Sequence, residues 1–198
     1  MLNNRGKAML LAKYSKEKKA DGMEMEGEEP ESMESDEMEM SADPAGMLCH
    51  LLGMLLAMRQ NYHSSHWQVS GPTFAGDHEL FNKLYNSVGE EIDTLAEKIV
   101  AKYGSDKVDA TKLSQGQTQQ LASWSGQPDP FQRGLASEKA LQATLKQVYD
   151  ALKGSGNLSL GMDDYLMATA NSHETNEYLL GQRTKGATPM VSVLRKGM

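Results

Sequence analysis

The stretch DHELFNKLYNSVGEEIDTLAEKIV, residues 77–100, carries the strongest periodic pattern in this 198-residue chain. Apolar side chains recur in it at steps of three and four residues, the spacing that places them along one face of an α-helix. The positions concerned are Leu80, Leu84, Val88, Ile92, Leu95 and Ile99. The pattern predicts a long helix with one buried face, which starts near Asp77 and ends at Tyr103-Gly104, where glycine provides the stop.

A second helix of the same kind is predicted before it. Asp43 and Pro44 form a helix start, because an acidic side chain caps the first free amides and proline fits the first helical position. The helix is expected to run to about Val69 and to stop at 70–72, which reads Ser-Gly-Pro. The residues predicted to form its buried face are Leu48, Leu51, Leu55, Met58 and Tyr62.

The second half of the chain predicts another helix pair after a long connection. Residues 105–134 are rich in Gln, Ser, Gly and Pro, and they predict a crossover with a short helical turn around 117–124. Helical periodicity returns over 137–154 and again over 162–180, with Gly181 as the expected stop. Two helix pairs joined by a long crossover describe an all-α, ferritin-like four-helix bundle.

Charge divides the chain into three segments behind its formal net charge of -7. Residues 1–20 carry six bases against one acid, whereas 21–43 carry eleven acids and no base, interleaved with Met, Ser, Gly and Pro. Because 1–43 has no sustained apolar face, we expect a disordered tail that acts as a solubilising segment or a spacer. The alternative is that its carboxylates and thioethers capture metal ions. The bundle is assigned to 44–181, and 182–198 is predicted to be a basic tail.

Composition argues against secretion and against a membrane span. The single cysteine, Cys49, cannot form an intramolecular disulfide and is interpreted as a small buried apolar residue. The apolar run at 8–12 is shorter than a signal-peptide core, and lysines follow it. No apolar stretch approaches the ~18 residues that a membrane-spanning helix requires. We therefore expect a soluble, cytoplasmic protein.

Four side chains at the end of the first helix and along the second have the composition of a metal site. They are His66, His78, Asp93 and Glu97. Asp93 and Glu97 are four residues apart, so they project from one helix face about one turn apart and can hold one ion together. Imidazole with carboxylate accepts iron, manganese or zinc, so the residue types alone do not select the metal.

Helix geometry predicts that this site is shared between two copies of the chain. His78 and Asp93 are separated by fifteen residues, or about 22 Å of helix, so they cannot share an ion within one chain. Their directions differ by only about 60°, so both leave the same side of the helix. A second copy packed antiparallel about a two-fold axis would bring its Asp93 and Glu97 opposite His66 and His78 of the first.

The residues around these positions resemble the signature of the Dps family, the mini-ferritins, in spacing as well as in type. The resemblance is carried by His66-Trp67, Gly71-Pro72, Phe74, His78-Glu79-Leu80, Asp93 and Glu97, and later by His173-Glu174 with Tyr178-Leu179-Leu180. It extends over about 44–181. It implies a shell of twelve subunits that oxidises Fe(II), with hydrogen peroxide preferred to oxygen, and stores the ferric mineral inside.

The same resemblance implies how the ligands are divided between subunits. Positions matching His66 and His78 belong to one subunit, and those matching Asp93 and Glu97 belong to its two-fold partner, with one or two iron ions at each site. One turn after His78 the family usually has aspartate, and this chain has Asn82. An amide oxygen can still bind a cation but lacks the carboxylate charge, so we expect Asn82 to be a ligand that lowers metal affinity or occupancy.

Several neighbouring residues have simpler interpretations. Glu90 and Glu91 are expected to belong to a solvated helix face, and Trp67 is expected to pack beside the site. His63 lies one turn before the first predicted ligand and is a less favoured ligand candidate. His173, on the apolar face of the fourth helix, is expected to be a hydrogen-bonded core histidine.

Three functions stay open from the sequence. The first is a ferroxidase that also stores its product. The second is a DNA-compacting shell protein whose basic tails contact phosphates, although the acidic tract at 21–43 would compete with DNA for the lysines before it. The third is a structural or cargo protein that kept the bundle and has a weakened iron site, for which Asn82 and the unusual tail are the only indications.

Overall fold

The computed structural model describes residues 43–185, and the predictions made for 1–42 and 186–198 lie outside this range. All regular structure within 43–185 is helical. The four long helices are α2 (Pro44–Gln68), α3 (Phe74–Tyr103), α5 (Pro130–Gly154) and α6 (Leu160–Lys185). The crossover contains a short 3-10 helix, η1 (Ser105–Val108), and α4 (Ala110–Trp124).

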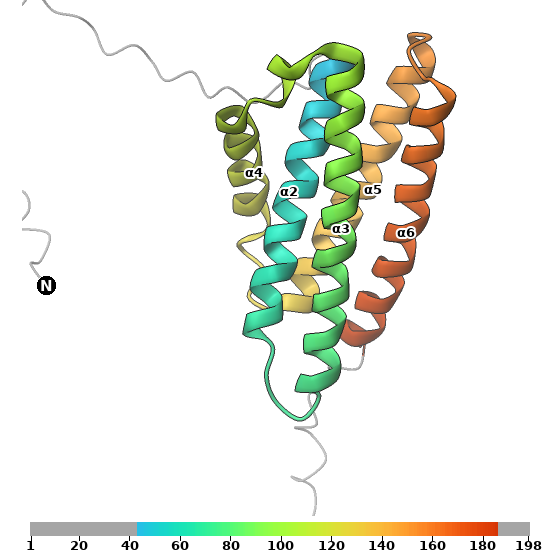
Figure 1. The fold of residues 1–198 in the computed structure, drawn as a ribbon. Coiled ribbons are helices and arrows are strands. Elements are labelled where there is room, and N and C mark those ends of the chain that lie inside the picture. The colour runs from blue at the N-terminus through green and yellow to red at the C-terminus, as the bar shows by residue number, and fades with distance from the viewer. Residues whose placement is uncertain (1–42, 186–198) are drawn as a thin grey trace, which may run out of the picture. The chain divides into compact units, whose positions relative to one another are not determined.

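Figure 1 shows the four long helices side by side, with α4 lying along α2. The predicted all-α four-helix bundle with a helical crossover is therefore confirmed. No helix within 43–185 is long and apolar enough to cross a bilayer.

α2 is the central element of the core. Its predicted start is confirmed, because the Asp43 carboxylate accepts hydrogen bonds from the amides of Ala45 and Gly46 at 3.4 and 3.3 Å. The helix packs against α3, α4 and α5, so it is enclosed on several sides and its buried residues exceed the single predicted stripe. The fully inaccessible apolar residues are Leu48, Leu51, Leu55, Ala57, Met58 and Tyr62.

Two predicted helix starts are wrong because aspartate caps extend the helices. α4 begins at Ala110, well before the predicted turn, and the Asp109 carboxylate accepts from two amides of its first turn at 3.1 and 3.0 Å. α5 begins at Pro130 and not at Ser137, with Asp129 accepting from a first-turn amide at 2.8 Å. Asp129-Pro130 repeats the Asp-Pro signal that starts α2.

The expected stop at Gly181 is also wrong, because α6 continues to Lys185. Arg183 in this last turn donates to the Asp77 carboxylate at 2.7 Å and to the Thr73 hydroxyl at 2.9 Å, both at the start of α3. This tertiary contact offsets the cost of about 1 kcal/mol that a glycine imposes within a helix. α3 likewise starts at Phe74, slightly before the predicted Asp77.

Cys49 differs from its interpretation as a buried apolar residue. The side chain is half-buried, and its thiol donates to the backbone carbonyl of Lys107 in η1 at 3.3 Å. Its place under the crossover, against the polar backbone of η1, explains why it is not enclosed in the apolar core.

Candidate metal centre

His66, in the last turn of α2, and His78, near the start of α3, contact each other across the turn that joins these helices. Nδ1 of His66 lies 2.9 Å from the backbone carbonyl oxygen of His78, and Nδ1 of His78 lies 3.0 Å from that of His66. The rings are stacked, with centroids 3.6 Å apart and an interplanar angle of 27°. The structure thus brings two of the predicted ligands together within one chain.

These reciprocal contacts determine which nitrogen of each ring can bind a metal. A carbonyl oxygen only accepts hydrogen bonds, so Nδ1 of both rings must carry a proton. In a neutral imidazole the other nitrogen, Nε2, then has the unshared electron pair. Hydrogen bonds of this kind orient histidines in metal sites, so the two half-buried side chains form a preorganised pair of nitrogen donors.

Asn82, the predicted oxygen ligand on the next turn of α3, uses its amide oxygen within the helix. The Tyr85 hydroxyl donates to Oδ1 of Asn82 at 3.0 Å, and Nδ2 of Asn86 donates to the same oxygen at 3.4 Å. A carbonyl oxygen has two lone pairs, so coordination by Asn82 would replace one of these hydrogen bonds. A ligand role for Asn82 therefore stays a prediction.

Aromatic rings flank the histidine pair. The ring of His63 lies 4.1 Å from Trp67 and 4.5 Å from Tyr85 between centroids, and Phe74 lies 5.0 Å from His78. Trp67 therefore packs beside the predicted site through His63. Trp67 is nevertheless 64% exposed and Phe74 is 46% exposed, so both rings are largely open to solvent in one chain.

Asp93 and Glu97 are exposed on α3, about 22 Å and about 28 Å along the helix from His78. The structure does not bring them to the histidines within one chain. Residues 43–185 contain no group of three or more His, Cys, Asp or Glu side chains that could hold a metal ion. One chain therefore presents two separate groups of predicted ligands, which we call the histidine half, His66 with His78, and the carboxylate half, Asp93 with Glu97.

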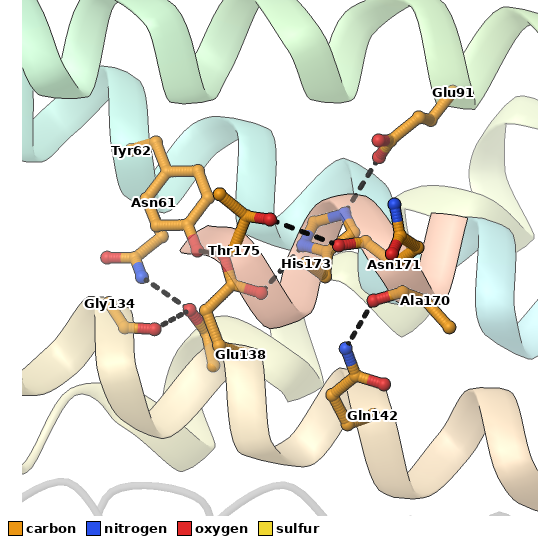
Figure 2. A network of polar contacts seen from close by, with 11 residues as sticks. Asn61, Tyr62, Glu91, Gly134, Glu138, Gln142, Ala170, Asn171, His173 and Thr175 are labelled. Atoms are coloured by element: carbon orange, nitrogen blue, oxygen red, sulfur yellow. Dashed lines mark hydrogen bonds and ion pairs between the residues drawn. The ribbon is translucent and has the colours of Figure 1, made fainter. Parts of the chain in front are cut away.

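A second polar cluster, shown in Figure 2, lies inside the bundle, and each long helix contributes one side chain to it. These side chains are Tyr62 of α2, Glu91 of α3, Glu138 of α5 and His173 of α6. Nδ1 of His173 lies 2.6 Å from Oε2 of Glu138, and Nε2 lies 2.8 Å from Oε2 of Glu91. The Tyr62 hydroxyl donates to Glu138. We call these four residues the central cluster.

The sequence predicted one member of the central cluster and missed the others. His173 as a hydrogen-bonded core histidine is confirmed, since its side chain is fully buried. The expectation that Glu91 is solvated is wrong, because its carboxylate turns toward α6 and is only 14% exposed. Glu138 could have been recognised from its place three residues before Leu141 and seven before Leu145, on the apolar face of α5, where a buried charge needs a partner.

Known sequences match parts of this chain. A family model of the ferritin-like domain matches residues 46–177. The DNA protection during starvation protein of Brevibacillus brevis is 46% identical over 43 residues, which make up 22% of this chain and 29% of that protein. The protein of the same name from Listeria innocua is 34% identical over 65 residues, or 33% of this chain and 42% of that protein. The chain thus spans less than half the length of these relatives.

Solved structures match over more of the chain. Dps from Thermosynechococcus elongatus has a TM-score of 0.64 at 22% identity, covering 75% of this chain and 94% of that one. Dps from Vibrio cholerae O1, described as a member of a broad superfamily of ferritin-like diiron-carboxylate proteins, has a TM-score of 0.61 at 18% identity, covering 71% and 88%. The ferritin-like model matches most of the chain, and Dps proteins are among its relatives and structural neighbours, so the chain belongs to the ferritin-like family and is similar to Dps proteins.

Proposed function

We propose that this chain forms a shell that oxidises Fe(II) and stores the ferric product, with each oxidation site shared by two subunits. Fe(II) is the substrate. The observation that supports this most directly is the histidine half, in which the two backbone contacts at 2.9 and 3.0 Å leave both Nε2 atoms as metal donors. The similarity to Dps proteins in sequence and in fold supports the same assignment.

In the proposed site, His66 and His78 of one subunit face Asp93 and Glu97 of its two-fold partner. Two neutral imidazoles with two carboxylates balance the charge of one ferrous ion and supply nitrogen and oxygen donors that iron accepts. His78 and Asp93 leave α3 in directions only about 60° apart, and His66 contacts His78, so an antiparallel pair of subunits would complete two sites at once. The exposed Trp67 and Phe74 lie beside the histidine half and would be covered by such a partner.

The protein side chains position the reactants, and the iron supplies the electrons. Each ferrous ion gives one electron, and hydrogen peroxide takes two as its O–O bond breaks, so two ferrous ions are consumed for each peroxide. Both peroxide oxygens pass to the ferric oxyhydroxide, two water molecules supply the remaining oxygens, and four protons are released to solvent. The four proposed ligands leave coordination positions to water or peroxide, and the protein therefore acts by binding and orienting its substrates.

Mixing two complementary variants tests whether the site is shared. One variant carries His66→Ala with His78→Ala, and the other carries Asp93→Ala with Glu97→Ala. Each is expected to lose peroxide-driven Fe(II) oxidation by itself. Random co-assembly of equal amounts makes half of the dimers mixed, and each mixed dimer has one intact site, so about a quarter of the sites should recover.

Ferric product formation by absorbance gives the readout, and a mixture of shells assembled separately is the control. Activity that appears only after joint unfolding and reassembly supports the shared site. Full activity in either variant alone, or no recovery after co-assembly, would contradict it.

DNA binding is a second candidate, because the two sequence relatives described above are named DNA protection during starvation proteins. One line of exposed lysines on α5 favours it: Lys139, Lys146 and Lys153 recur every seven residues on one side of the helix. Such a line could contact phosphates, and binding would then weaken steeply with salt. Gel retardation at increasing salt, with all three lysines changed to Gln, tests this; unchanged retardation by the triple variant would exclude α5 as the contact.

A further inference from the structure

The geometry of the central cluster fixes how many protons it holds. Both ring nitrogens of His173 lie within hydrogen-bond distance of carboxylate oxygens, at 2.6 Å from Glu138 and 2.8 Å from Glu91. An ionised carboxylate and an unprotonated ring nitrogen can both only accept, so each contact needs its own bridging hydrogen. A neutral imidazole brings one. The cluster therefore contains one proton more than a neutral histidine between two carboxylates.

We propose that this additional proton makes His173 a structural cation, which joins α3, α5 and α6 inside the bundle. Loss of the proton at alkaline pH loosens the contact between α3 and α6. The inference goes beyond iron chemistry and uses none of the proposed iron ligands. It makes His173 the pH-sensitive element of the fold.

Charge balance explains why the bundle needs this proton. Glu138 is fully buried and Glu91 is 14% exposed, and burying two carboxylates without a positive partner is strongly unfavourable. Within residues 43–185, the other titratable groups that face the cluster are phenols. Tyr62 of α2 donates to Glu138, and Tyr165 of α6 donates to the backbone carbonyl of Glu91 at 3.0 Å. Burial raises the pKa of both phenols, so they stay neutral and cannot neutralise the carboxylates or replace His173.

The protonation equilibrium of His173 also favours the doubly protonated ring. Burial by itself would lower the pKa of this histidine, but the hydrogen bonds to Glu138 and Glu91, together with their charges, outweigh it and raise the pKa to about 9. Because the folded value exceeds the unfolded one of about 6.5, the contribution to stability is complete below pH 6.5 and is lost as the pH rises through about 9.

The position of Glu91 determines which contact opens. A pocket of about 260 Å³ between α3 and α6 reaches Glu91, and it is lined by Ser87, Glu90, Glu91, Thr94, Tyr165, Ala168 and Thr169. Solvent reaches Glu91 through this pocket, so the proton is expected to be lost from the contact between His173 and Glu91. The neutral imidazole then keeps a single N–H, and the hydrogen bond to fully buried Glu138 is the costlier one to lose. The unshared pair of Nε2 is left facing Glu91, which turns to solvent.

Proton release on unfolding tests the proposal in the assembled full-length protein. The parent is Cys49→Ser, because burial also raises the pKa of that thiol and would add its own alkaline slope. At pH 8, unfolding by guanidinium in weak buffer should release about one proton per chain, as a pKa of about 9 in the folded state requires. The guanidinium concentration at the midpoint of unfolding should decrease as the pH is raised from 7 to 9.5.

Two variants in this background identify the group responsible. His173→Gln should abolish both the proton release and the alkaline fall of the midpoint. His50→Gln, the same substitution at a half-buried histidine whose pKa burial lowers, should preserve both. Release near zero in the parent, or unchanged release in a folded His173→Gln protein, would overturn the proposal. If His173→Gln does not fold, the proton count of the parent decides, since one proton supports the inference and none excludes it.

Discussion

His66 and His78 hold each other in place: Nδ1 of each ring donates to the backbone carbonyl oxygen of the other, at 2.9 and 3.0 Å. The contact that joins the end of α2 to the start of α3 therefore uses one nitrogen of each ring and leaves the other for a metal. Because the two tasks belong to different atoms, substitutions can separate them.

Replacing His78 by Asn or by Gln makes this separation. The Asn amide nitrogen approaches the place of Nδ1, so His78→Asn should keep the backbone hydrogen bond and the stability while losing the metal donor. In His78→Gln the longer side chain places its amide nearer the position of Nε2. The backbone hydrogen bond should then be lost, which lowers the free energy of unfolding by about 1 kcal/mol. Guanidinium unfolding with Co(II) titration would measure both properties. Metal binding by His78→Asn equal to that of the unchanged protein would show that Nε2 is not a ligand.

The exposure of Trp67 predicts an observable consequence of assembly. The chain has two tryptophans, and Trp124 is buried at 5% exposure, so Trp124→Phe leaves Trp67 as the sole tryptophan, whose emission can be excited selectively. In the proposed shell a partner covers this side chain, which is 64% exposed in one chain, so its emission should lie at short wavelength and resist acrylamide quenching. Light scattering should show a large oligomer, with twelve subunits expected from the Dps resemblance. A monodisperse monomer with solvent-exposed Trp67 emission would contradict the shared site.

The contact between Arg183 and Asp77 should stabilise the last turn of α6. Arg183→Met leaves the Asp77 side chain, which is 8% exposed, with the Thr73 hydroxyl as its hydrogen-bond donor. The arginine side chain is 39% exposed, so Arg183→Met should lower the free energy of unfolding by only about 1 kcal/mol, the low end for a hydrogen bond between charged groups. Adding Asp77→Asn should recover most of it, because the unpaired charge is removed. If the stability loss of the double variant equalled the sum of the losses in Arg183→Met and Asp77→Asn, the two side chains would not be coupled.

Local signals predicted the helices better than their ends. The apolar periodicity of α3 and the Asp43-Pro44 start of α2 depend on neighbouring residues and are confirmed. The end of α6 depends on Arg183 reaching Asp77 across the bundle, a contact between residues 106 positions apart. Gly181 gives no local indication of that contact. The start of α5 at Asp129-Pro130 was available from the sequence, because it repeats the signal that was used at α2.

The two polar sites differ in what sequence could predict. Motif spacing singled out His66 and His78, and the structure brings them together, whereas Asp93 and Glu97 stay a prediction that only an assembly can test. The central cluster combines four helices through pairs separated by 35, 76 and 82 residues, so no local spacing identifies it. Burial on the apolar face of α5 was the available signal, and it applied to Glu138 alone.

Asn82 provides the sharpest test of how far the Dps motif carries over to this chain. Its Oδ1 accepts from the Tyr85 hydroxyl at 3.0 Å and from Asn86 at 3.4 Å, and an aspartate oxygen can accept both of these hydrogen bonds without a change in shape. Asn82→Asp should therefore preserve the packing and add a negative charge one turn beyond His78. A hard anionic oxygen binds iron better than an amide does, so we expect higher ferrous occupancy and faster peroxide-driven oxidation. Asn82→Ala removes the acceptor of Tyr85 but no charge, and it should lower the rate less than His66→Ala does. Stopped-flow oxidation and anomalous scattering on the three variants would measure rate and occupancy. If Asn82→Asp changed neither, residue 82 would lie outside the coordination shell, and the iron site would consist of the two histidines and the partner's carboxylates.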